Sequence, residues 1–90
     1  MTGYAKNKDE LLKRLARVEG QVRGIARMIE DDRYCIDVLT QVSAVRKAVD
    51  AVALRLVDDH VRHCIADSSG DERAARTDEL MAAVGRLVKA

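Results

Sequence analysis

The sequence predicts an all-α protein whose protomer has three helices, the central one much longer than the others. Proline is absent from the 90 residues, and Ala, Leu, Glu, Lys and Arg, which favour helix, are abundant. Apolar residues recur in alternating steps of three and four, which is the helical period and not the two-residue period of strands. Because 90 residues allow only one domain, we expect a single domain over 1–90.

The first helix is predicted between Asn7 and the Asp31-Asp32 pair. Asn7 and Glu10 have the spacing of a capping box, in which each side chain bonds the other residue's backbone N–H. The two aspartates interrupt the apolar pattern and are expected to end the helix, and Asp32 is expected to cap the next one. The apolar stripe consists of Leu11, Leu15, Val18, Val22, Ile25 and Ile29.

The second helix is predicted from about Tyr34 to Ile65. A helix of this length is a rod of roughly 45 Å, too long for a compact monomer of this size. Small side chains line its middle, so we expect it to pair with a second copy of itself. The apolar stripe is Val38, Val42, Val45, Val49, Val52 and Leu56, and the small residues are Ala44, Ala48, Val49, Ala51 and Ala53.

The third helix is predicted after the break at residues 68–70. Ser69 and Glu72 have the spacing of a second capping box, which would begin the helix. Its shorter apolar stripe consists of Leu80, Val84, Leu87 and Val88.

The composition predicts an obligate oligomer in a reducing compartment. The chain has no Phe or Trp and only two Tyr, so it lacks the bulky groups that usually fill a small core. Two cysteines without a signal peptide favour ligand or redox use over a disulfide framework. Since no apolar run approaches the ~20 residues needed to span a bilayer, we expect a cytoplasmic protein with no membrane partner.

Three side chains are candidate metal ligands. His60 and Cys64 are four residues apart on the second helix, so both project from the same face. Cys35 lies at the start of that helix, roughly 37 Å from His60 if the helix is unbroken. Either the helix is broken between them, for which no Pro or Gly gives a signal, or Cys35 completes the site from another subunit.

An antiparallel dimer places the three ligands together. If a two-fold axis passes near Ala48 and Val49, Cys35 of one chain lies opposite residues 61–63 of its partner. That position is between His60 and Cys64, and the small side chains lie at the same crossing point. Two-fold symmetry then produces two identical sites.

The ligand set favours a soft metal ion. Two sulfurs and one nitrogen suit trigonal Cu(I), whereas Zn(II) usually takes a fourth ligand. Zn(II) with a water or carboxylate, and Ni(II) or Co(II) if His63 joins, stay open. On spacing alone, so does the interpretation of the cysteines as small buried apolar residues. His63 is interpreted as a surface residue, and Tyr34 as either a packing residue or a hydrogen-bonding group near the Cys35 sulfur.

Three segments resemble one known family. Residues 14–25 (RLARVEGQVRGI), residues 34–44 (YCIDVLTQVSA) and residues 60–64 (HVRHC) resemble the conserved blocks of the CsoR/RcnR repressors. The resemblance covers nearly the whole chain. It implies a three-helix protomer, an antiparallel dimer and a tetramer with dihedral symmetry. It also implies a repressor that holds operator DNA without metal and releases it with metal.

The resemblance further implies the copper-sensing branch. Copper sensors of this family use a Cys, His, Cys set, which Cys35, His60 and Cys64 reproduce. In them a tyrosine beside the first cysteine and a glutamate on the third helix support the ligands. Tyr34 matches the tyrosine, and Glu79 is the candidate for the glutamate, although the loop before the third helix leaves its alignment open.

A basic face on the first helix is the candidate DNA contact. Between Lys6 and Arg27 there are seven basic and three acidic residues. No helix-turn-helix or zinc-finger signature is present, so we expect broad contact with phosphates and not a recognition helix in the major groove. The candidate residues are Lys13, Arg14, Arg17, Arg23, Arg46, Lys47 and Arg55.

Two other functions stay open on the sequence alone. One is a repressor of the same fold that senses persulfides or thiol oxidation, with Cys35 and Cys64 linked through sulfur. The other is a copper-binding helical oligomer without DNA binding, which the basic first helix disfavours. An enzyme with a small-molecule substrate is not expected, because the sequence offers no phosphate loop and no acid–base pair in a pocket.

Overall fold

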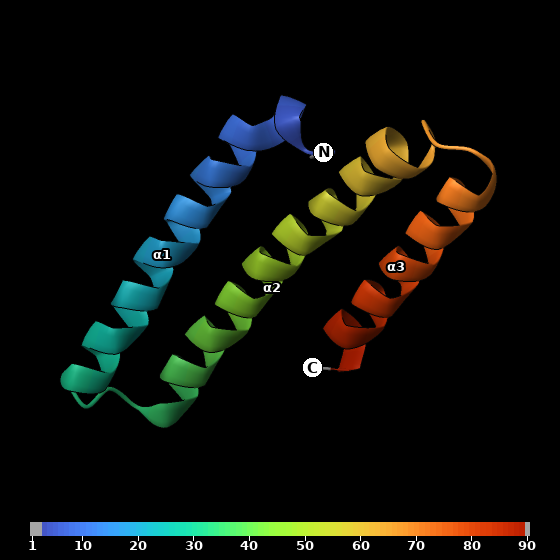
Figure 1. Ribbon diagram of the computed structural model, residues 1–90. Helices are drawn as coiled ribbons and strands as arrows, with labels where there is room; N and C mark the ends of the chain where they lie inside the picture. Colours follow the sequence, from blue (N-terminus) through green and yellow to red (C-terminus); the bar gives the residue numbers. More distant parts are fainter. Residues whose placement is uncertain (1–2, 90) are drawn as a thin grey trace. The chain divides into compact units, whose positions relative to one another are not determined.

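The computed structural model describes residues 3–89 and shows three main helices, without a strand among those residues (Figure 1). They are α1 (Lys8–Glu30), α2 (Cys35–His60) and α3 (Gly70–Lys89). A short 3-10 segment, η1 (Ala5–Asn7), precedes α1, and a π-helical segment, η2 (Val61–Ile65), directly follows α2. The predicted all-α protomer with a long central helix is confirmed.

The contacts of the chain divide it into two units. One unit covers residues 7–54 and contains α1 and most of α2. The other combines residues 3–6 with residues 55–89, and so contains the end of α2, η2 and α3. His60 and Cys64 belong to this second unit, which therefore contains the predicted histidine–thiol pair.

The start of α1 lies where the sequence predicts it, but one half of the predicted capping box is not formed. Asn7 is the residue that precedes the helix, and its side chain makes no capping hydrogen bond. Glu10 pairs with Arg14 one turn later, with 3.2 Å between Arg14 Nη2 and Glu10 Oε1. This is an i, i+4 ion pair along the helix surface.

The end of α1 is a Schellman motif, with Asp32 in the left-handed conformation at φ 56°. The Asp32 N–H donates to Ile29 O at 3.1 Å, and the Arg33 N–H donates to Met28 O at 2.9 Å. These bonds satisfy carbonyls that the helix end would leave without partners. The prediction that Asp32 caps the following helix is wrong, because Asp32 closes α1 and α2 begins only at Cys35.

The predicted second helix changes type before it ends. The α-helix stops at His60, and the next five residues form η2, in which Ala66 N–H donates to Val61 O, five residues back, at 2.9 Å. A π-helical turn is wider than an α-helical one and is often found at functional sites. Here it contains Cys64, one of the predicted ligands.

Two arginines of α3 hold the carbonyl groups at the end of η2 and in the loop after it. Arg76 Nη1 donates to Cys64 O at 2.7 Å, while Arg73 donates through Nε to Ser68 O at 2.8 Å and through Nη2 to Ala66 O at 3.1 Å. Because a helix end leaves carbonyls unsatisfied, these bonds stabilise the irregular turn. They also fasten α3 to the backbone around Cys64, in agreement with the contact between α3 and η2.

The third helix starts at Gly70, whose φ of 59° lies in the left-handed region that favours glycine. The glycine is therefore needed for the chain to turn into α3. Glu72, which has the capping-box spacing from Ser69, pairs with Arg76 one turn later.

One chain buries very little apolar surface. Among the described residues the buried apolar side chains are Leu11, Val52 and Cys64. Large apolar side chains are exposed along every helix, including Leu15, Val22 and Ile29 of the first predicted stripe and Val42, Val49 and Leu56 of the second. No helix in the described part of the chain has both the length and the apolar character to cross a membrane.

Candidate metal centre

His60 and Cys64 lie at the junction between α2 and η2. His60 is the last residue of α2 and is half-buried, and Cys64 is the fourth residue of η2 with only 3% of its surface exposed. Cys64 is a free thiol. An imidazole and a thiol at this spacing form a donor pair that suits soft or intermediate metal ions.

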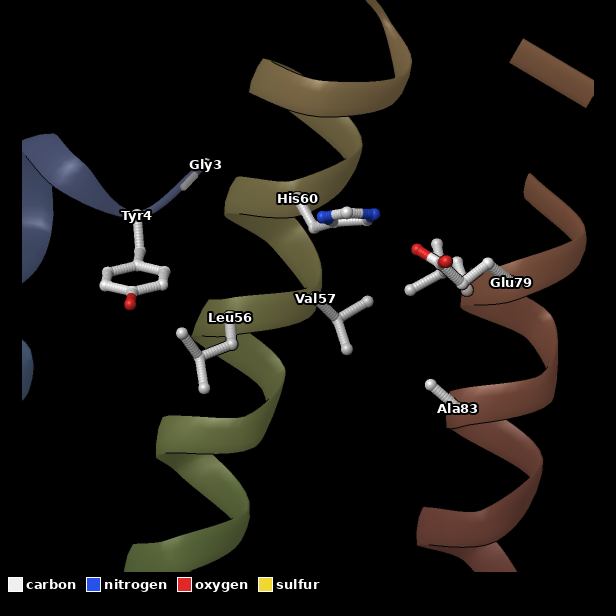
Figure 2. A pocket seen from close by; sticks show the side chains of 8 residues that line it. Gly3, Tyr4, Leu56, Val57, His60, Glu79 and Ala83 are labelled. Carbon is white, nitrogen blue, oxygen red and sulfur yellow. The ribbon is translucent and has the colours of Figure 1, made fainter. Parts of the chain in front are cut away.

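A pocket of about 310 Å³ opens beside His60 (Figure 2). The imidazole projects from α2 toward α3, and the carboxylate of Glu79 projects from α3 toward the imidazole. The carboxylate is therefore on the side from which it could orient the ring. The pocket is lined by Gly3, Tyr4, Leu56, Val57, His60, Glu79, Leu80 and Ala83.

The other predicted ligand, Cys35, is the first residue of α2 and is exposed. The 26 residues of α2 run without interruption from Cys35 to His60, so a rise of about 1.5 Å per residue separates the two by roughly 37 Å. Within residues 3–89 of a single chain, no group of three His, Cys, Asp or Glu side chains is placed to hold a metal ion. Tyr34, next to Cys35, is 70% exposed.

Two residues near the histidine–thiol pair were not predicted from the sequence. Gly3 lies against the Cys64 sulfur, and Tyr4 lines the same pocket as His60. Both precede the first apolar stripe, so no periodic pattern includes them. The only available signal was that Tyr4 is one of two aromatic residues in the chain.

The predicted DNA-contacting side chains differ in their ionic partners. Arg14 and Arg23 pair with acidic residues one turn earlier, Glu10 and Glu19, at 3.2 and 3.4 Å. Arg55 Nε lies 3.7 Å from a carboxylate oxygen of the buried Asp59. The four that form no ion pair within the described chain are Lys13, Arg17, Arg46 and Lys47, all of them exposed.

Residues 7–86 match the family described as metal-sensitive transcriptional repressor. The chain belongs to this family. The copper-sensing transcriptional repressor RicR of Mycobacterium tuberculosis is 54% identical over 90 residues, covering 97% of this chain and 94% of RicR. The copper-sensing transcriptional repressor CsoR of Bacillus subtilis is 55% identical over 73 residues, covering 79% of this chain and 72% of CsoR.

A solved structure of the metal-sensitive repressor family has the same fold. The crystal structure of the copper-sensing repressor CsoR with Cu(I) from Geobacillus thermodenitrificans matches with a TM-score of 0.84 and 38% sequence identity. The match covers 93% of this chain and 88% of that protein. The family predicted from the three sequence segments is thus confirmed, and with it the class of transcriptional repressors.

Proposed function

We propose that this chain is a Cu(I)-responsive transcriptional repressor, which binds operator DNA without metal and releases it when Cu(I) binds. The observation that carries the proposal is the placement of His60 beside the pocket and of the Cys64 thiol on the adjoining π-helical turn. The identity of 54–55% with two copper-sensing repressors supports the choice of metal. The protein acts in the cytoplasm, and as a regulator it converts no substrate.

The proposed copper site is shared between two subunits. Cys35 of one subunit joins His60 and Cys64 of the other. The unbroken α2 supports this arrangement, because it separates Cys35 from His60 within a chain. Two thiolates and one imidazole would hold Cu(I), a soft ion for which such ligands are suited.

The proposed assembly is an antiparallel dimer along α2, which pairs further into a dihedral tetramer. Exposed apolar side chains on α2 support it, because a chain that leaves such residues in water gains stability when a second copy covers them. With a two-fold axis near Ala48 and Val49, the dimer covers the middle of the rod and produces two identical sites. The exposed apolar residues of α2 are Ile36, Leu39, Val42, Val49, Leu54 and Leu56.

The release of DNA follows from the way Cys64 is held. Its carbonyl accepts a hydrogen bond from Arg76, so a shift of the Cys64 backbone on ligation is transmitted to α3. Cys35 at the other end of the helix is pulled toward the partner at the same time. The protein then has two states, one that binds Cu(I) more tightly and one that binds DNA more tightly. The coupling between two such sites is typically about 1–3 kcal/mol, so Cu(I) binding lowers the affinity for DNA by about 5- to 150-fold.

Glu79 and Tyr34 are proposed to support the ligands. Glu79 faces His60 across the pocket (Figure 2), where it can accept a hydrogen bond from the ring nitrogen that does not bind metal. Tyr34 adjoins Cys35 and would act in the shared site of the dimer. His60 thereby connects the metal to α3 through its second nitrogen.

The substitution Glu79→Gln tests the role of Glu79. The amide is nearly the same size but accepts the imidazole proton less strongly, so we expect Cu(I) affinity to fall by about 10- to 100-fold. The release of DNA at saturating Cu(I) should weaken as well. Competition with a Cu(I) chelator measures the first effect and fluorescence anisotropy of labelled DNA the second. Asp78→Asn is the matched control, because Asp78 is an exposed carboxylate on the same helix that does not line the pocket, and an equal loss there would contradict the proposal.

The proposed function as a whole is tested by titrating Cu(I) into the protein bound to the DNA upstream of its own gene. We expect the anisotropy to fall to that of free DNA near one Cu(I) per subunit, because each subunit contributes to one site. The variant Cys35→Ala should stay on the DNA throughout the titration. If the wild-type protein does not bind the DNA without metal, or stays bound at saturating Cu(I), the proposed function is wrong.

A further inference from the structure

The amino-terminal segment covers the sulfur of Cys64. A methyl group placed on Gly3 would lie 2.7 Å from Asp59 O and 3.1 Å from Cys64 Sγ. The first distance is shorter than non-bonded atoms allow, so the backbone reaches this position only because residue 3 has no side chain. The contact lies within the unit that contains the histidine–thiol pair.

The two residues that this segment covers, Cys64 and Asp59, are buried. Cys64 is 3% exposed, and the neighbouring Asp59 is 2% exposed although it is charged. A buried carboxylate is costly unless it is paired, and Arg55 lies 3.7 Å from it. The segment therefore covers a buried sulfur next to a buried ion pair.

Tyr4 extends the same cover toward His60. Its side chain lines the pocket beside Leu56 and His60 (Figure 2). Gly3 thus lies on the thiol while the next residue contacts the pocket of the imidazole, so the segment spans both candidate ligands of one chain. Cys35, in contrast, is exposed.

We propose that residues 3–6 form a strap that screens the Cys64 sulfur from bulky thiol reagents, and that Gly3 is the residue that lets the strap close. The inference rests on the proposed function in one respect, since it concerns access to a proposed Cu(I) ligand. None of the residues in η1 (Ala5–Asn7) is buried, and a short segment with few buried contacts opens locally at small free-energy cost. A small ion exchanged between thiols passes during brief openings, whereas larger electrophiles react slowly. The strap therefore favours metal over thiol-modifying inducers.

The test measures alkylation of the two cysteines in the full-length, metal-free protein. Iodoacetamide is added, samples are quenched over time, and peptide mass spectrometry gives a separate rate for Cys35 and for Cys64. In the wild-type protein we expect Cys64 to react about tenfold more slowly than it does in the same protein unfolded in urea, or slower still, because it reacts only from the open state. In Gly3→Val the Cys64 rate should rise about tenfold while the Cys35 rate stays unchanged.

The control and a second variant make the result decisive. At Gly85 an added methyl group meets nothing within 4 Å, so Gly85→Ala should leave both rates as in the wild type. Tyr4→Ser removes the other anchor of the strap without crowding Cys64, and should also accelerate only Cys64. Circular dichroism verifies that each variant is folded, and if Gly3→Val is not, Tyr4→Ser decides.

Two results would contradict the proposal that residues 3–6 form a strap. One is a wild-type Cys64 that reacts as fast as it does in the unfolded protein, and the other is a folded Gly3→Val protein whose Cys64 is protected as in the wild type. Neither measurement involves copper or DNA, so their outcome is independent of whether the protein proves to be a Cu(I)-responsive repressor.

Discussion

Cys35→Ala and Cys64→Ala are each expected to lower Cu(I) affinity by more than about 100-fold, whereas a mixture of the two variants recovers tight sites. Loss of a supporting group alone costs about 10- to 100-fold in metal affinity, and loss of a ligand costs more. In a mixed dimer, the Cys64→Ala subunit supplies Cys35, and the Cys35→Ala subunit supplies His60 and Cys64. One of its two sites is therefore intact.

The recovery distinguishes a shared site from one built within a chain. Equal amounts of the two variants, unfolded together and refolded, form mixed dimers at random, so about a quarter of all sites should bind tightly. A chelator competition measures this fraction, and each variant refolded alone is the control. A mixture that binds no better than its components would show that the ligands do not come from two chains, and the antiparallel register would be wrong.

Most of the fold could be predicted because it depends on local pattern. The three- and four-residue steps of apolar residues and the absence of proline indicate the helices, and Gly70 marks the start of α3. The π-helical turn could not be predicted, because Arg73 and Arg76 stabilise it from the next helix. At both predicted capping boxes the glutamate, Glu10 or Glu72, pairs with an arginine one turn later, a contact that the capping pattern does not include.

In the candidate site, too, local sequence pattern predicts some residues, whereas others depend on contacts between distant segments. His60 and Cys64 follow from their spacing, because a four-residue step brings side chains to one face whatever else the chain does. Glu79 needed the structure, since the loop before α3 sets the register that turns it toward His60. Gly3 and Tyr4 belong to no periodic pattern, and their contacts depend on where the chain folds back onto residues far along the sequence.

The structure also indicates which basic side chains of the predicted DNA-binding face are most available to contact phosphates. Arg55 pairs with the buried Asp59, and a charge bound in this way is less available to a phosphate. Arg14 and Arg23 are paired on the surface, where an ion pair contributes little and is readily exchanged. Lys13 and Arg17 are exposed on α1 without an ion pair in the described chain, so they are the strongest candidates for phosphate contact.

The double substitution Lys13→Ala, Arg17→Ala is accordingly expected to weaken DNA binding by the metal-free protein for every sequence alike. For the wild type, affinity should fall by about 10³-fold or more between roughly 50 and 200 mM salt, because each phosphate contact releases counterions from the DNA. Removing two contacts should make the slope of log affinity against log salt shallower by about two. Fluorescence anisotropy of an operator duplex and of an unrelated duplex, each at several salt concentrations, measures both quantities.

Arg62→Ala provides the control, because Arg62 is also exposed but lies on η2 and pairs with Asp58. Its removal changes the net charge without touching α1, so the salt slope should stay close to that of the wild type. An equal decrease in slope for Arg62→Ala would mean that DNA responds to overall charge and not to the face on α1. If the double variant instead lost affinity for the operator alone, Lys13 or Arg17 would read sequence, and the assignment of this face to phosphate contact would be wrong.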